Sequence, residues 1–207
     1  MVAFLALTAL EGWEGSGLPY PVLYIFKAAV VTVALVMSRK VWKDIGFSWS
    51  MLAIGVLVGA LCYIEWIYVD RHTHHFSFLG TRTAYNPFHE ISNSAFRDVF
   101  LLIRFYGLVV MVPVMEELFW RSFLLRWITE PDFARLKVGE FSLTAFAAVT
   151  GLFALSHPEW LAAAIFAAAM ALLLKRTGSL FACIIAHSTT NLLLGIYVIH
   201  TGHWQLW

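Results

Sequence analysis

Six long apolar runs constrain the fold of this chain more than any other feature. A hydrocarbon core of about 30 Å is crossed by a helix of roughly 20 mostly apolar residues. The runs lie at Tyr20–Met37, Phe47–Val69, Val99–Met115, Phe141–Ser156, Trp160–Leu174 and Ser179–Ile199. We expect the third run to continue as helix to Ile128, whereas the fourth and fifth are short for full spans. The sequence therefore predicts an all-α, polytopic bundle of about six to eight membrane helices.

The composition supports a membrane protein and excludes several other classes. Apolar residues make up 60% and charged residues 13% of the 207 residues, against roughly 45–50% and 25% in a typical soluble protein. So few charges cannot cover a water-soluble protein of this size. The formal net charge of +1 gives no basic field for nucleic acid, so we expect no nucleic-acid partner. We expect instead a multi-pass integral membrane protein in contact with the lipid bilayer.

The chain is expected to form one integral-membrane domain in two parts. Residues 1–98 would supply the amino-terminal membrane helices and a polar loop, and residues 99–207 a second helix bundle. The longest polar stretch is Asp70–Asp98, which could be a cap, a substrate contact or a plain connector. The opening Met1–Leu10 is apolar but short, which favours a segment at the interface or partly inserted in the bilayer.

Basic residues gather in alternate short loops, a pattern that predicts six spans with both termini outside. They are Arg39, Lys40 and Lys43, then Arg126, Arg135 and Lys137, then Lys175 and Arg176. This topology places Glu116 near the inner end of its span and His157 near the outer end of its own. Either the fourth segment stops at mid-membrane, or these boundaries are wrong.

Three clusters of polar residues lie inside apolar segments, where ionisable groups are costly and usually face a bundle interior. The first is Glu116 and Glu117 with Arg121, the second is His157, and the third is His187 with Asn191. Glu117 and Arg121 are four residues apart on one helix face, which favours a structural ion pair. Glu116 is displaced from Glu117 by about 100° on a helix of 3.6 residues per turn, and this leaves it available for chemistry.

Alone, each remaining polar residue has a structural interpretation. His157 precedes Pro158 and would end a helix, and Asn191 would link two helices. His187 and Asn191 are also one helical turn apart and could face one substrate atom. Together, a carboxylate, two histidines and an asparagine supply the base, polariser and oxyanion donors of a water-activating site.

These motifs, in this order, resemble the CAAX prenyl protease and bacteriocin-processing family of intramembrane glutamate proteases. The motifs are Glu116-Glu117-x-x-x-Arg121, Phe153-x-x-x-His157 and His187-x-x-x-Asn191. The segment Lys175–Leu180, just before the last motif, also looks like the turn typical of that family. The resemblance covers roughly Val99 to Ile199 and implies an all-helical membrane endopeptidase with its catalytic cavity between the motif helices.

The resemblance also implies a role for each motif residue. Glu116 would activate the hydrolytic water with assistance from His157, and His187 and Asn191 would stabilise the oxyanion. Glu117 and Arg121 would support these groups from behind. The resemblance favours a glutamate mechanism without a metal or other cofactor, and neither His-Glu-x-x-His nor Cys-x-x-Cys occurs in the chain.

Other functions remain open at this point. The chain could be a non-catalytic immunity or scaffold protein that binds a partner peptide, a small transporter or proton relay, or a metal-dependent membrane hydrolase. The expected partner is a membrane-associated peptide or protein substrate, and the sequence does not determine the oligomeric state. Its small size and lack of an organelle-targeting signal favour a bacterial inner (cell) membrane.

Overall fold

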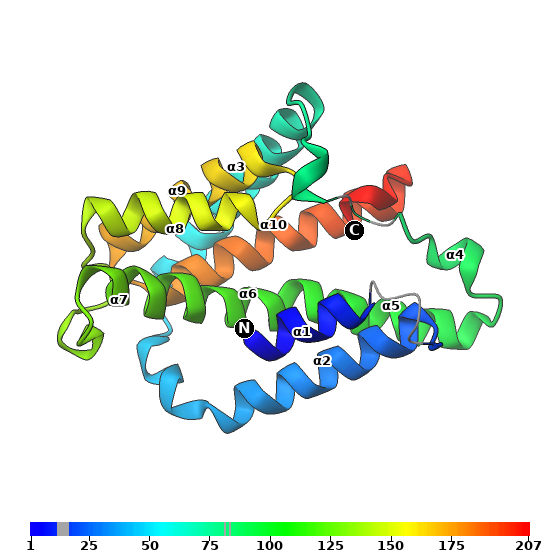
Figure 1. Cartoon of the computed structure of the whole chain (residues 1–207), viewed down its shortest axis with the longest axis horizontal. Helices are drawn as coiled ribbons and strands as arrows, with labels where there is room; N and C mark the ends of the chain where they lie inside the picture. The colour runs from blue at the N-terminus through cyan, green and yellow to red at the C-terminus, as the bar shows by residue number, and fades with distance from the viewer. Residues whose placement is uncertain (12–16, 81, 83) are drawn as a thin grey trace.

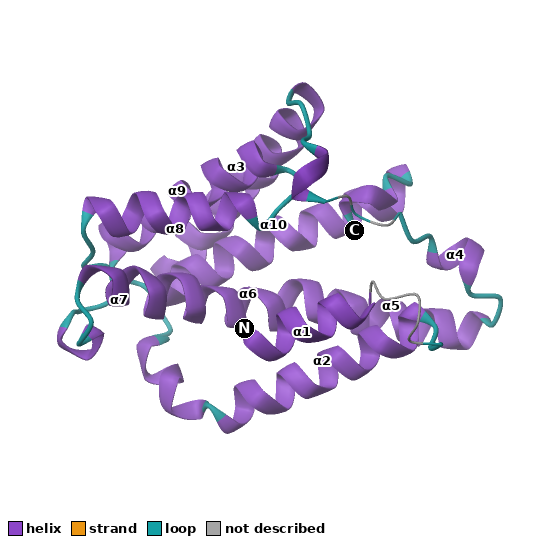
Figure 2. Cartoon of the chain, viewed as in Figure 1, coloured by secondary structure: helices purple, strands orange, loops and turns teal. Residues whose placement is uncertain are grey.

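The computed structural model describes residues 1–11, 17–80, 82 and 84–207, and these residues form helices joined by loops. Figure 2 shows no strand among them, so the predicted all-α fold is confirmed. Within this part of the chain, five helices are long and apolar enough to cross a membrane. They are α2 (Tyr20–Met37), α3 (Trp49–His72), the continuous helix Ser94–Thr129, α9 (Trp160–Thr177) and α10 (Leu180–Thr201).

The helix Ser94–Thr129 is built from α-helical and π-helical pieces in alternation. Its α-helical pieces are α5 (Ser94–Tyr106), α6 (Val112–Glu117) and α7 (Leu125–Thr129). The π-helical pieces are Gly107–Met111 and Leu118–Leu124. The predicted extension of the third run is thus found. π-Helical turns are rare and frequent at functional sites, and here they flank the short segment that carries Glu116 and Glu117.

The fourth apolar run is the exception to the predicted spans. It forms α8 (Leu143–Leu155), a helix of 13 residues, which is about 20 Å long at a rise of 1.5 Å per residue. Such a helix does not cross a core of about 30 Å. The fourth segment is therefore too short as a helix to cross the core alone, and His157 follows its end.

The polar stretch is shorter than predicted, because the helices on both sides extend into it. The structure continues α3 through Asp70 to His72 and begins α5 at Ser94, so both ends of the expected Asp70–Asp98 loop are helical. Between them lie a 3-10 turn at Ser77–Leu79 and the short helix α4 (Pro87–Glu90). The connector thus runs from about residue 73 to residue 93.

The long helix lies between two groups of helices (Figure 1). On one side α1 (Val2–Glu11) packs along α2, and on the other lie α3, α8, α9 and α10. Lys27, buried on α2, donates to Glu11 and to Thr8 at 3.3 Å, which ties α1 to the bundle. The polar residues predicted to act together are on the long helix, on α10 and in the turn after α8. They therefore lie where the long helix packs against α8 and α10.

Helices α3 and α10 pack closely because small residues line their contact. A Cβ atom added to Gly55 would lie 2.8 Å from the carbonyl oxygen of Ala182, and one added to Gly59 would lie 2.7 Å from Cβ of Thr189. The hydroxyl of Thr190 donates to the carbonyl oxygen of Gly59 at 2.9 Å. Glycines spaced by four residues let membrane helices approach in this way, and this contact fixes the position of α10.

The turn before α10 has sequence features that end one helix and begin the next. Gly178 has a φ of +63°, the left-handed conformation that glycine adopts without steric cost after a helix end. The hydroxyl of Ser179 accepts from the backbone N–H of Ala182 at 3.2 Å and caps α10. The start of α10 is therefore fixed, and His187 lies about two turns further on.

Candidate functional site

Glu117 lies at the centre of the polar cluster, between His187 and Arg121. Nδ1 of His187 is 2.8 Å from Oε1 of Glu117, and Nε of Arg121 is 3.3 Å from Oε2. The exposed fractions of Glu117, Arg121 and His187 are 0%, 1% and 5%. The expected pair of Glu117 and Arg121 is present, and His187 joins it as a third member.

Arg121 is enclosed by aromatic rings in addition to its carboxylate partner. Its guanidinium carbon lies 4.9 Å from the ring centre of Phe153 and 5.9 Å from that of Phe166. All three of its guanidinium nitrogens are buried and form no hydrogen bond within the described part of the chain, so its contact with Glu117 is an ion pair. A buried cation is stabilised by its anionic partner and by the faces of aromatic rings. The guanidinium of Arg121 therefore requires the carboxylate of Glu117 beside it.

Glu116 lies beside this cluster but is not locked into it. It is half-buried, and among the described residues no hydrogen bond involves its carboxylate. The charges that act on it include those of His187, Glu117, Arg121 and Arg82, and its own charge acts on the amino group of Met1. Of the two neighbouring carboxylates, Glu116 is therefore the one free to contact a water molecule.

His157 occupies the turn between α8 and α9, with one ring nitrogen fixed. Its Nδ1 lies 2.8 Å from the carbonyl oxygen of Phe153, and because a carbonyl only accepts, this nitrogen carries the hydrogen. The imidazole stacks on the Phe153 ring at 4.5 Å between centroids. The Phe-x-x-x-His spacing thus stacks the imidazole of His157 on the ring of Phe153. Because Nδ1 carries the hydrogen, Nε2 of the neutral imidazole has the free lone pair.

The surroundings of His157 keep the imidazole neutral. Burial lowers its pKa to about 4, and the charge of Arg82 acts in the same direction. The charge of His187 also acts on this ring, which brings the turn into the same electrostatic neighbourhood as α10. Near neutral pH, Nε2 of His157 is therefore an acceptor for a proton.

Asn191 is directed toward the backbone of the long helix. Its Nδ2 donates to the carbonyl oxygen of Leu108 at 2.9 Å. In the π-helical segment the N–H of Val112 bonds to Gly107, five residues back, so Leu108 would pair with residue 113. That residue is Pro113, which has no N–H. Asn191 supplies the missing donor, and one of its two amide hydrogens is used in this way.

The structure therefore brings most of the predicted site residues together. Glu117, Arg121 and His187 are in direct contact, and Glu116 and His157 lie in the field of the same charges. Asn191 lies one turn beyond His187 and donates to the carbonyl oxygen of Leu108. Among the described residues, no three His, Cys, Asp or Glu side chains are grouped so that they could hold a metal ion.

Two charged residues near this cluster were not predicted. Nε of Arg82 lies 2.9 Å from Oε1 of Glu159, and Nη2 lies 3.0 Å from Oε2. Burial alone would raise the pKa of Glu159, but the guanidinium of Arg82 outweighs it and the pKa is lowered. The position of Glu159, two residues after His157, was a signal in the sequence, whereas nothing distinguished Arg82.

Glu65 on α3 was also missed. Both of its carboxylate oxygens are buried and have no hydrogen-bond partner in the described structure. It interrupts the apolar run Phe47–Val69, so the rule that singled out Glu116 would have found it.

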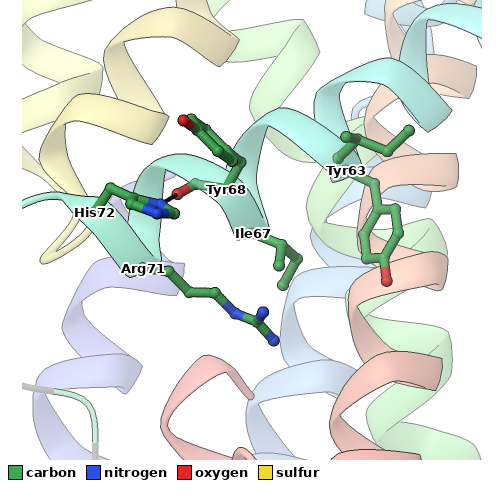
Figure 3. A pocket seen from close by; sticks show the side chains of 6 residues that line it. Tyr63, Ile67, Tyr68, Arg71 and His72 are labelled. Carbon is green, nitrogen blue, oxygen red and sulfur yellow. Dashed lines mark hydrogen bonds between the residues drawn. The ribbon is translucent and has the colours of Figure 1, made fainter.

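The two pockets that stand out lie away from the polar cluster. One, of about 270 Å³, runs along α3 and is lined by Tyr63, Ile64, Ile67, Tyr68, Arg71 and His72 (Figure 3). There Nδ1 of His72 donates to the carbonyl oxygen of Tyr68 at 2.7 Å. The other, of about 360 Å³, lies between α2 and α5. None of the predicted site residues lines either pocket.

Comparison with known proteins gives one match. Residues 98–193 match the Rce1-like family, described as type II CAAX prenyl endopeptidase Rce1-like. The matched range spans just under half of the chain and includes all six predicted site residues. No curated protein and no solved structure matches the chain.

Proposed function

We propose that this integral membrane protein hydrolyses a peptide bond of a membrane-associated peptide or protein, because residues 98–193 match the Rce1-like family of type II CAAX prenyl endopeptidases. The observation that carries the proposal is the position of Glu116. Its carboxylate forms no hydrogen bond or ion pair among the described residues, and it lies beside the buried cluster of Glu117, Arg121 and His187.

In the proposed reaction, Glu116 and His157 hold the attacking water between them. The carboxylate of Glu116 takes a proton from the water as its oxygen attacks the scissile carbonyl carbon. The lone pair on Nε2 of His157 accepts the second hydrogen of the water and orients it. When the tetrahedral intermediate collapses, Glu116 returns the proton to the leaving amine nitrogen.

His187 and Asn191 would stabilise the negative oxygen of the intermediate. With a proton on both ring nitrogens, His187 donates from Nδ1 to Glu117 and from Nε2 to the oxyanion. Asn191 has one amide hydrogen engaged by Leu108 and a second that is available to the substrate. Glu117 and Arg121 hold the imidazole in this orientation and do not touch the substrate.

Glu117 is the poorer candidate for the base. Its two oxygens face Arg121 and His187, and its side chain is fully buried. To reach a water it would have to leave a buried cation, a separation that costs about 3–5 kcal/mol. Glu116 is one residue away and pays no such penalty.

The proposal is tested with purified protein in liposomes and a panel of membrane-tethered peptides, with products mapped by mass spectrometry. We expect one defined cleavage site, unaffected by a chelator. Glu140→Gln, which changes an exposed loop carboxylate, serves as the matched control for Glu116→Gln. The control should cleave like wild type. Chelator inhibition would favour the metal-dependent hydrolase, and an intact panel would favour the non-catalytic scaffold.

We further propose that the protein resides in a bacterial cell membrane; the apolar composition and the five long apolar helices support the membrane placement. Fractionation of cells that express it, followed by carbonate extraction of the membranes, tests this placement. Recovery in the soluble fraction would contradict it.

A further inference from the structure

Arg82 is held over the turn that carries His157. Two parallel hydrogen bonds, at 2.9 and 3.0 Å, join its guanidinium to the carboxylate of Glu159. The connector that carries Arg82 is attached to α9 at a second place, because Nε1 of Trp160 donates to the carbonyl oxygen of His74 at 3.1 Å. The guanidinium is therefore fixed in position by a buried partner.

One edge of this guanidinium is still available. A guanidinium has five N–H donors, and Glu159 uses one on Nε and one on Nη2. No other residue that the structure describes accepts from the remaining three. The side chain of Arg82 is 34% exposed, whereas that of Glu159 is 4% exposed. The pair therefore presents the second edge of the fork for another acceptor.

The charge of Arg82 acts on the groups that we propose to react. Glu159 follows His157 by two residues, and the charge of Arg82 acts on both His157 and Glu116. A planar fork with two parallel donors matches a carboxylate better than any other common group. The geometry calls for an anionic substrate group near the scissile bond.

We propose that Arg82 binds the terminal carboxylate of the peptide substrate and that Glu159 orients Arg82 for this contact. The inference rests on the proposed function. A CAAX sequence occupies the last four positions of a chain, so the bond cleaved within it lies at most three residues from the carboxylate. Three extended residues span about 10–11 Å, a length that joins the reacting groups to a nearby anion site.

The experiment compares two tethered peptides that differ only at the carboxyl terminus, one a free acid and the other an amide. For wild type we expect kcat/KM to be about tenfold higher on the acid, as a charge-assisted contact of this kind provides. This preference should shrink at high salt, because Arg82 is partly exposed. Arg82→Gln should raise KM on the acid much more than on the amide, so that the preference for the acid is lost, and Arg82→Lys should keep part of the preference.

Glu159 and Arg97 complete the set of variants. Glu159→Gln should raise KM for the acid more than KM for the amide, because it removes the carboxylate that orients Arg82. Arg97→Gln, which changes an arginine paired with Asp98 at 3.8 Å, should retain the full preference. Melting temperatures of all variants, measured in detergent, identify any that fail to fold.

Binding of the same peptides to Glu116→Gln separates this inference from the proposed function. Tighter binding of the acid than of the amide supports the carboxylate site. If wild type cleaves neither peptide, that result counts against the proposed peptidase and not against the carboxylate site. Equal binding of acid and amide, or an equal loss on both peptides in Arg82→Gln, would overturn the inference and leave the peptidase standing.

Discussion

Glu117 and His187 are separated by 70 positions in the chain, and Oε1 of the first lies 2.8 Å from Nδ1 of the second. This contact joins the long helix to α10 in the buried interior. With Arg121 on the opposite carboxylate oxygen, it fixes an imidazole whose second nitrogen points away from the pair. The arrangement distinguishes two consecutive glutamates, because Glu117 is engaged by two partners whereas the carboxylate of Glu116 forms no hydrogen bond among the described residues.

Loss of Arg121 should destabilise the protein strongly. Arg121→Met would leave the carboxylate of Glu117 buried without its cation and lower the free energy of unfolding by about 3–5 kcal/mol. The double variant Glu117→Gln/Arg121→Met should lose less than the sum of the single variants. Unfolding by detergent titration measures both. Strict additivity would contradict the pairing, and Arg135→Met, at an exposed ion pair, should change stability by less than about 1 kcal/mol.

Asn191 and Pro113 should show coupled effects on stability. Asn191→Leu leaves the carbonyl oxygen of Leu108 without a donor, at an expected cost of about 1–3 kcal/mol. In a Pro113→Ala background the new N–H can take over, so the same substitution should cost at least about 1 kcal/mol less. Thermal unfolding of wild type, the two single variants and the double variant measures this coupling. An equal cost in both backgrounds would refute the role given to Asn191.

Two glycines provide a matched test of the contact between α3 and α10. Gly59→Ala places a methyl group against α10, 2.7 Å from Cβ of Thr189, and should destabilise by about 1–3 kcal/mol. Gly151→Ala on α8 meets nothing within 4 Å and should stabilise the helix by up to about 1 kcal/mol. If both variants had lower melting temperatures than wild type, or both had higher ones, the close packing of α3 on α10 would be ruled out.

Acid should destabilise the protein partly through His157. The pKa of this group falls from 6.5 to about 4 on folding, chiefly by burial. Its contribution to stability is complete above the unfolded pKa of 6.5 and is lost as the pH falls toward 4. The carboxylate of Glu159, whose pKa is lowered from 4.5, contributes to acid sensitivity only below that pH.

His157→Phe keeps a ring against Phe153 and removes the titration. Melting temperatures between pH 7 and pH 4.5 should therefore fall more steeply for wild type than for this variant. Parallel curves would show that His157 is not buried as a neutral ring. His89→Gln changes an exposed histidine and should leave the wild-type curve unaltered.

The sequence predicted the helical architecture because a bilayer leaves few alternatives for apolar runs. The run Phe141–Ser156 shows the limit of this argument, since hydropathy identified the segment but not the end of α8 at Leu155. The π-helical segment Gly107–Met111 is similarly hidden, because apolar composition does not report hydrogen-bond register. The partner of Asn191 depends on that register, so its contact with Leu108 could not be foreseen.

The sequence predicted which residues form the candidate site better than it predicted the contacts between them. Helical spacing gave the pair of Glu117 and Arg121, since both are on one element. The contact of Glu117 with His187 and that of Arg82 with Glu159 join distant segments, and isolated charges carry no periodic signal. Glu65 differs, because the rule about charges inside spans applies to it and would have revealed it.

The central claim, that Glu116 and not Glu117 activates the water, is tested most directly by the cleavage rate of one membrane-tethered peptide. Wild type, Glu116→Gln and Glu117→Gln are compared in liposomes under single-turnover conditions, with folding of each variant verified. The account predicts that Glu116→Gln binds the peptide normally but loses cleavage by at least about 100-fold, while Glu117→Gln loses stability and keeps measurable cleavage. Cleavage by Glu116→Gln at the wild-type rate would contradict it.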